Sequence, residues 1–139
     1  MGFRSFSVLG VLLPVLAAFL SYLPALGNGW AWDDRQRILE ALPIRSLDAH
    51  LLSWAFTTLS GSYWMPLTWI SFALDWKLGG GSPLAFHLTN VLLHAANSVL
   101  VLLLARALFS AGRGPSGERP WEGTAALLSG LLFAVHPLH

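Results

Sequence analysis

An uncharged apolar run from Phe6 to Leu26 constrains this chain more than any other feature of its sequence. At a rise of about 1.5 Å per residue, a helix over this run is about 30 Å long, which is enough to cross the hydrocarbon core of a bilayer. A secretory signal peptide is the alternative. The run exceeds the roughly 7–15 apolar residues of such a peptide, so a retained anchor is favoured. Pro14 within the run predicts a kink.

Two further apolar runs predict helices later in the chain. The second predicted span covers about 84–108, and the third, about 121–135, is short for a full crossing. Hydrophobic residues make up 55% of the chain and charged residues only 11%, against about 25% charged residues in soluble domains. We therefore expect an all-α membrane protein with three transmembrane helices. The net charge of +1 gives no indication of nucleic acid as a partner.

The basic residues predict how these spans are oriented in the membrane. Arg4 precedes the first span, and Arg106, Arg113 and Arg119 flank the short link at 109–120 between the second and third spans. Lys and Arg favour the cytoplasmic side of a membrane, so the N-terminus and this link are expected there. The long segment 27–83 is then a large outer loop on the periplasmic or extracellular face.

The outer loop holds all of the seven tryptophans except Trp121. Indole rings concentrate in the headgroup layer, so we expect the loop to lie on the membrane surface. Apolar residues at helical spacing from Leu47 to Leu59 predict a short interfacial helix, and Asp48 near its start suits the helix dipole. A second loop helix is predicted from Pro66 to Leu78, because Pro is common in a first helical turn and Gly79 follows the last residue.

Two adjacent carboxylates, Asp33 and Asp34, follow the first span directly. Crowding of like charges is costly, and a site that needs a general base or a cation ligand gives a reason to keep them together. The alternative is a solvated turn or a helix cap at the end of the span. Taken alone, the pair favours the turn or cap. Polar residues elsewhere in the chain shift the balance toward a functional site.

A stripe of polar residues runs along the second span at helical spacing: His87, Asn90, His94 and Asn97. Polar side chains at membrane depth face a partner helix or a wet cavity, so interhelical hydrogen bonding and a functional role are both open for them. His136 and His139 end the third span, and if that span runs outward they reach the same membrane face as the two aspartates. The histidines do not follow zinc-ligand spacing, and the chain has no cysteine.

Five motifs follow one another in an order that is fairly specific as a set. They are Asp33-Asp34, Tyr63-Trp64-Met65-Pro66-Leu67-Thr68-Trp69, Leu74-Asp75-Trp76, His87-Leu88-Thr89-Asn90-Val91-Leu92-Leu93-His94, and Leu132-Phe133-Ala134-Val135-His136-Pro137-Leu138-His139. Together they resemble the N-terminal part of bacterial multispanning membrane proteins that carry tetratricopeptide repeats. Those proteins are similar to the protein O-mannosyltransferases and other C-type glycosyltransferases. The resemblance runs from about residue 28 to the last residue, and no repeat is found in it.

The resemblance implies a fold and a reaction. The chain would be part of a larger C-type glycosyltransferase bundle in the inner membrane, with Asp33 or Asp34 as the catalytic acid of the first outer loop. The reaction would move a sugar, often mannose, from a polyprenyl phosphate to a protein Ser or Thr hydroxyl or to another hydroxyl acceptor such as a glycan. Related proteins carry Arg at the position of Met65, so that phosphate-binding residue has no counterpart here.

An anionic lipid phosphate needs cationic or hydrogen-bonding groups as it leaves. The candidates for binding the donor are Arg35, His87, Asn90, His94, His136 and His139. The adjacent aspartates could also hold Mg²⁺ or Mn²⁺ together with phosphate oxygens, although no full ligand set is visible. We expect the remainder of a longer chain to complete the pocket, so that this segment alone is inactive. The alternatives are a non-enzymatic membrane anchor or scaffold and, less favoured, a transporter fragment.

Overall fold

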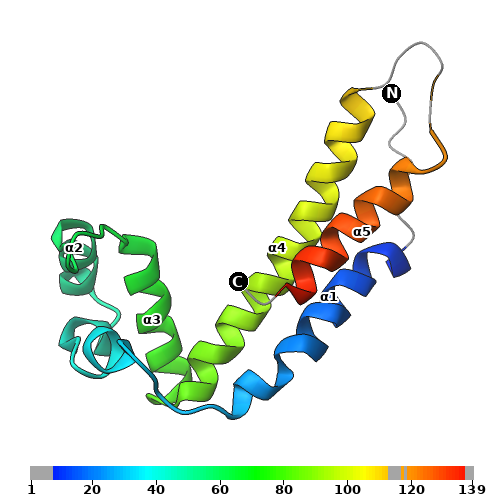
Figure 1. Ribbon diagram of the computed structural model, residues 1–139. Helices are drawn as coiled ribbons and strands as arrows, with labels where there is room; N and C mark the ends of the chain where they lie inside the picture. Colours follow the sequence, from blue (N-terminus) through cyan, green and yellow to red (C-terminus); the bar gives the residue numbers. More distant parts are fainter. Residues whose placement is uncertain (1–7, 113–116, 118, 137–139) are drawn as a thin grey trace. The chain divides into compact units, whose positions relative to one another are not determined.

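The computed structural model describes residues 8–112, 117 and 119–136. Within these residues the chain is helical and has no strand (Figure 1). The longer helices are α1 (Val8–Tyr22), α2 (Ala49–Thr57), α3 (Pro66–Gly79), α4 (Pro83–Ala111) and α5 (Glu122–Val135). Three short helical segments join them: η1 (Leu23–Gly27), η2 (Arg35–Leu39) and η3 (Leu42–Arg45).

The chain divides into two compact units that are described separately. The three-helix unit consists of residues 1–24 and 90–139, with α1, α5 and most of α4. The loop unit consists of residues 25–89, with α2, α3 and the first turns of α4.

Small side chains hold the three-helix unit together. The fully or nearly buried positions recur every four residues on α1 (Gly10, Pro14, Ala18) and on α5 (Ala126, Gly130, Ala134). Figure 1 shows α5 beside both α1 and α4. A Cβ on Gly130 would lie 2.8 Å from Leu102 Cβ, 3.0 Å from the Ser98 carbonyl oxygen and 3.4 Å from Pro14 Cγ. Small residues let helices approach closely in lipid, where the hydrophobic effect does not drive helices together.

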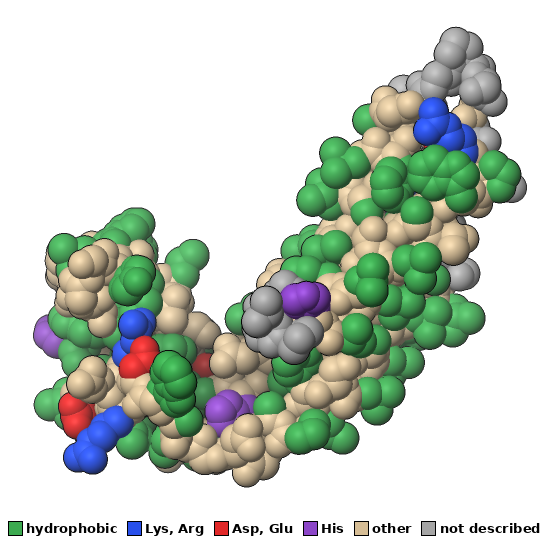
Figure 2. Space-filling model, in the orientation of Figure 1, with side chains coloured by type: hydrophobic (Ala, Val, Ile, Leu, Met, Phe, Trp, Pro, Cys, Tyr) green, Lys and Arg blue, Asp and Glu red, His purple; other side chains and the backbone are tan. Residues whose placement is uncertain are grey.

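Leucine side chains cover the outside of this unit. Leu9, Leu16 and Leu20 of α1 are 64%, 53% and 72% exposed, and Leu100 and Leu104 of α4 are each 59% exposed. Figure 2 shows hydrophobic side chains along these helices, with basic side chains near the end that carries the α4–α5 connection. Such a surface is costly in water and favourable in a bilayer. The chain is therefore a membrane protein, as its composition predicted.

Two of the three predicted spans are long and apolar enough to cross a membrane. Val8–Gly27 has a mean hydropathy of 2.1 and Pro83–Ala111 one of 1.9. The third, α5, has 14 residues, which is about 21 Å of helix and short of the roughly 30 Å hydrocarbon core. The prediction of two long spans is confirmed by length and composition, and a third crossing by α5 stays a prediction.

The loop unit has a hydrophobic core of its own. Ile38, Ile44, Leu51, Ala55, Trp69, Ala73 and Phe86 are buried in it. Aromatic rings connect its parts: Trp54 lies 4.9 Å from Trp69, and Phe86 lies 5.7 Å from Phe72 and 5.1 Å from Trp30 between ring centroids. The tryptophans were expected in the headgroup layer. Trp69 is only 2% exposed and packs in the core instead, because helices this short need large side chains to bury enough area.

Both predicted loop helices are confirmed, and their ends follow from local chemistry. Asp48 is the N-cap of α2, where its side chain accepts a hydrogen bond of 2.9 Å from the Leu51 N–H, and this bond lowers the pKa of Asp48. Pro66 opens α3, and Gly80 ends it with φ of 59°. That left-handed conformation carries little cost in glycine.

A buried acid joins α3 to α4 within the loop unit. Asp75 is 6% exposed, and its Oδ1 accepts a 2.6 Å hydrogen bond from the Thr89 hydroxyl. Burial raises the pKa of Asp75, while the Thr89 bond opposes part of that rise. The folded state therefore holds the Asp75 proton more tightly than the unfolded state does. It follows that the free energy of unfolding decreases as pH rises from the ordinary pKa of 3.8 through the raised value.

We expect Asp75→Asn to be at least as stable as the unchanged protein at pH 7, and to lose this pH dependence. The amide oxygen can still accept from Thr89 without carrying a buried charge. Thermal unfolding of both proteins in lipid nanodiscs between pH 4 and pH 8 measures the effect. A variant that is clearly less stable at pH 7 would show that the ionised carboxylate stabilises this junction.

Candidate functional site

The two adjacent aspartates lie in a tight turn that leads into η2. The Asp34 N–H donates to the Ala31 carbonyl oxygen at 3.0 Å, and the Ala31 N–H donates to Asp34 Oδ2 at 2.8 Å. Asp34 therefore closes the turn with its own side chain, as the alternative of a turn predicted, and this side chain makes no capping hydrogen bond to η2. Among the contacts of the described residues, the Asp33 carboxylate accepts no hydrogen bond from the backbone. It pairs with a side chain instead.

Trp32, directly before the acid pair, is strained and exposed. Its φ is +49°, which is unusual for a large side chain, and its side chain is 99% exposed. A left-handed residue of this kind costs about 1–2 kcal/mol. Strained backbone persists where the surrounding structure imposes it, often at functional sites. The strained residue and the two acids therefore mark this turn as the candidate site.

Asp33 pairs with an arginine one helical turn later. Arg37 Nε lies 2.6 Å from Asp33 Oδ2 in an i,i+4 ion pair. The Asp33 side chain remains 57% exposed and that of Arg37 is 32% exposed. Asp33 is thus open to a ligand on one side and held by a cation on the other.

Arg37 also reaches the second sequence motif. Its Nη1 donates to Met65 Sδ at 3.6 Å, and its guanidinium carbon lies 6.0 Å from the centre of the Tyr63 ring. We call Asp33, Arg37, Tyr63 and Met65 the acid–arginine cluster. Sequence reasoning did not single out Arg37. The i,i+4 spacing from Asp33 was the signal that could have identified it, since residues at this spacing face each other on a helix.

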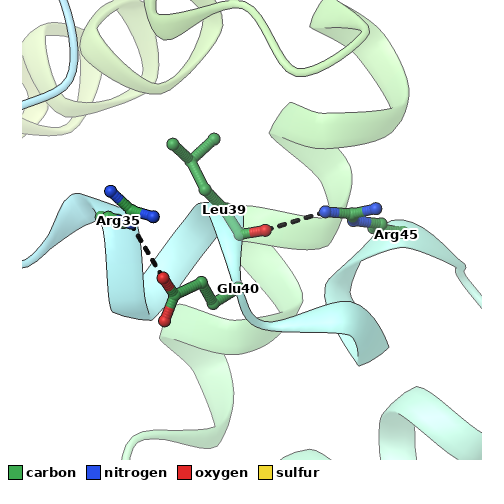
Figure 3. Close-up of polar contacts among 4 residues, drawn as sticks. All are labelled: Arg35, Leu39, Glu40 and Arg45. Carbon is green, nitrogen blue, oxygen red and sulfur yellow. Dashed lines mark hydrogen bonds and ion pairs between the residues drawn. The ribbon is translucent and has the colours of Figure 1, made fainter.

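The other two arginines of the loop unit have different partners (Figure 3). Arg35 Nε lies 2.9 Å from Glu40 Oε1, and both side chains are well exposed. Arg45 Nη2 donates to the Leu39 carbonyl oxygen at 2.8 Å, and its guanidinium lies 5.0 Å from the Trp76 ring centre. Arg45 therefore supports the fold of the loop, and the predicted donor-binding role of Arg35 stays a prediction.

His87 belongs to the loop unit and is half-buried. Its Nε2 is buried and has no hydrogen-bond partner among the residues that the structure describes. A buried polar atom without a partner is costly. Its predicted role in donor binding stays a prediction.

In the three-helix unit, His94 joins three helices. Its Nε2 lies 3.0 Å from the Ala134 carbonyl oxygen near the end of α5, its ring packs edge-on against Tyr22 at 4.8 Å, and it stacks on Phe133 at 5.3 Å. The last carbonyls of a helix have no partner within the helix, so this contact satisfies one of them. The interhelical interpretation of His94 is therefore the one that these contacts support.

The remaining predicted residues are less enclosed. Asn90 and Asn97 are exposed on α4. His136 is exposed, and its carbonyl oxygen accepts a 2.6 Å hydrogen bond from the Tyr22 hydroxyl. His139 lies outside the described residues. The predicted gathering of these groups with Asp33 and Asp34 on one membrane face stays a prediction.

The sequence left open whether the acid pair binds a divalent metal. Within residues 8–112, 117 and 119–136, no three His, Asp or Glu side chains lie close enough together to hold a metal ion. Whether Mg²⁺ or Mn²⁺ binds there with help from substrate phosphates is a question that these residues alone do not decide.

Comparison with known proteins identifies relatives but no template. No family model and no solved structure matches the chain. The chain is 38% identical to protein O-mannosyl-transferase Tmtc1 of Drosophila melanogaster over 88% of its own length and 14% of that protein. It is 38% identical to Tmtc2 of the same organism (88% and 13%) and 35% identical to tmtc2 of Xenopus laevis (92% and 15%).

The chain thus spans about one seventh of the length of these relatives. They are animal proteins, and the expected likeness to bacterial ones is not tested by them. The resemblance predicted from the motifs is confirmed at the level of the family: over most of its length this chain is homologous to proteins named protein O-mannosyl-transferase.

Proposed function

We propose that the protein containing this chain transfers a sugar, mannose in the first instance, from a polyprenyl-phosphate donor to a Ser or Thr hydroxyl or a similar acceptor. The observation that carries the proposal is the exposed Asp33 beside a strained, exposed Trp32. It occurs in a chain homologous to proteins named protein O-mannosyl-transferase. This chain supplies the acidic loop and the first spans, and the rest of the protein completes the pocket.

Asp33 is the better of the two acids as a general base. Asp34 Oδ2 is already committed to the Ala31 N–H, whereas the Asp33 carboxylate has an exposed side. In the proposed step, Asp33 takes the proton of the acceptor hydroxyl while that oxygen attacks the anomeric carbon. The bond from this carbon to the phosphate oxygen breaks, and the lipid phosphate leaves with the bonding electrons. A positioned carboxylate suits this task because a neutral hydroxyl is a poor nucleophile.

The membrane arrangement proposed for this reaction follows the charge distribution. The N-terminus and the 109–120 link face the cytoplasm, and the loop unit faces the periplasm or the outside. The protein would then be a multi-pass protein of the inner membrane, as part of a C-type glycosyltransferase bundle. The donor lipid would lie in the bilayer, with its phosphate at the level of the loop unit.

Reconstitution tests the proposed function directly. The full-length protein in liposomes receives either mannosyl-phosphoryl-polyprenol or GDP-mannose, together with a Ser/Thr-rich peptide. We expect the peptide to gain the mass of one hexose with the lipid-linked donor only. Transfer from GDP-mannose without lipid, or no transfer from either donor, would contradict the proposal.

A further inference from the structure

We propose that Arg37 binds the phosphate of the donor lipid, and that Arg37 releases Asp33 as it does so. This inference rests on the proposed function and assigns a ligand to a residue of the same site. The ligand chemistry is a phosphate ester attached to an isoprenoid chain. Arg37 would be the group that couples arrival of the donor to the availability of the base.

The first argument is charge. Asp33 and Asp34 lie side by side, and an anionic phosphate that approaches them meets two negative charges. A cation within reach of both the phosphate and Asp33 is needed to offset this repulsion. Arg37 is that cation, because its Nε already contacts Asp33 Oδ2 at 2.6 Å. The planar guanidinium matches the geometry of phosphate oxygens, with several donors arranged as a fork.

The second argument is the weakness of the other Arg37 contacts. Thioether sulfur is a poor acceptor, so the 3.6 Å contact with Met65 Sδ holds the guanidinium only loosely. The Tyr63 ring, 6.0 Å from the guanidinium carbon, lies at the outer limit of a cation–π interaction. One side of the Arg37 side chain is accessible, since it is 32% exposed. Arg37 can therefore leave Asp33 for a phosphate without breaking any other strong contact described for it.

The third argument excludes Arg45 and Arg35, the other two arginines of the loop unit. Arg45 donates to the Leu39 carbonyl oxygen and lies over Trp76, so moving it would break contacts that shape the loop. Arg35 is exposed but pairs with Glu40 rather than with either aspartate. Of these three arginines, Arg37 is the one whose ion pair would be exchanged for phosphate at the proposed base.

The exchange has a specific consequence for Asp33. While Arg37 is paired with it, Asp33 Oδ2 has a lone pair engaged and is a less available proton acceptor. When the phosphate takes the guanidinium, that oxygen becomes free for the acceptor hydroxyl. No bond to the sugar is made or broken in this step. Asp33 Oδ2 would thus be released from its ion pair only when a donor is present.

Binding measurements on the full-length protein in nanodiscs test this inference without requiring turnover. The probe is farnesyl phosphate, a soluble short-chain isoprenoid phosphate, titrated by calorimetry. Inorganic phosphate and farnesol are separate arms that distinguish the phosphate from the lipid. We expect Arg37→Gln to weaken farnesyl phosphate binding about tenfold or more, since hydrogen bonds to charged groups are strong. Arg37→Lys should recover part of the affinity, and farnesol binding should not change.

Lys77→Gln controls for the loss of a positive charge. It removes a positive charge from an exposed position of α3 and leaves Arg37 unchanged. It is expected to bind farnesyl phosphate within about twofold of the unchanged protein. Equal weakening by Lys77→Gln and Arg37→Gln would show that Arg37 acts through net charge alone, and it would overturn the inference.

Asp33→Asn should change the affinity for farnesyl phosphate in the opposite direction. It also distinguishes competition between Asp33 and phosphate for Arg37 from simple charge repulsion of the phosphate. We expect it to tighten farnesyl phosphate binding several-fold, and by more than Asp34→Asn does, because only Asp33 competes for Arg37. If Asp33→Asn and Asp34→Asn tighten farnesyl phosphate binding equally, the proposed exchange of Asp33 for phosphate at Arg37 is overturned. Unchanged binding in Arg37→Gln, with transfer still lost in Asp33→Asn, would refute this inference and leave the proposed function standing. Normal transfer in Asp33→Asn would refute the proposed function instead.

Discussion

Asp33→Asn is expected to reduce sugar transfer by about 10²- to 10⁴-fold, which is the range lost when a general base is removed. Asparagine has nearly the same shape but cannot take a proton at neutral pH. The Asp33 side chain is 57% exposed, so the loop unit should still fold and the protein should still insert. Mass spectrometry of peptide products from liposomes containing the full-length protein measures the loss.

Asp34→Asn is the matched control for this prediction. Its amide oxygen can still accept from the Ala31 N–H, so the turn is preserved. We expect transfer to fall less than about tenfold. A large loss in Asp34→Asn with normal transfer in Asp33→Asn would reverse the two roles. Tolerance of both changes would favour the membrane anchor or scaffold hypothesis.

Gly130→Ala is expected to destabilise the three-helix unit by about 1–3 kcal/mol, the usual cost of overpacking a well-packed interior. The added Cβ would lie 2.8 Å from Leu102 Cβ and 3.0 Å from the Ser98 carbonyl oxygen. Both distances are too short for an ordinary contact, and the backbone atom of Ser98 cannot turn away. The helices would have to separate, which also loses contacts with α1 at Pro14. Thermal unfolding in nanodiscs measures the change.

Gly123→Ala is the matched control on the same helix. Gly123 lies in the first turn of α5, and a Cβ there would meet no heavy atom within 4 Å. Alanine is the better helix former, so this change should stabilise α5 by about 0.5–1 kcal/mol. Similar destabilisation by both changes would show that the α5 backbone, rather than contact with α4, is sensitive at Gly130.

The helices and their ends could be predicted because their causes are local. The apolar runs give helices α1 and α4, Asp48 caps α2, Pro66 starts α3, and Gly80 ends it. The end of α3 lies one residue later than predicted, because Gly79 is the last residue of the helix and Gly80 takes the left-handed conformation. Each of these features depends on neighbouring residues and on backbone preferences that act over a few positions.

The partners of the polar side chains could not be predicted in the same way. The pairing of Arg37 with Met65 joins residues 28 positions apart, and the contact of His94 with Ala134 joins residues 40 positions apart. The burial of Trp69 likewise depends on Trp54, which belongs to a different helix, α2. Sequence spacing left two interpretations open for His94, placed Trp69 with the other tryptophans in the headgroup layer, and did not single out Arg37. Contacts over long separations in the sequence decided the outcome for each of them.

The amino-acid sequence by itself determined that this is a helical membrane protein, that an acid pair follows its first span, and which family it resembles. These properties reside in hydrophobic runs and in short motifs, and they do not depend on how the chain packs. Only the tertiary structure decided that Arg37 reaches Met65, that His94 reaches Ala134, and that Gly130 lies where two helices touch it. Those outcomes depend on which side chains reach the same place in space, and that is set by the packing of whole elements.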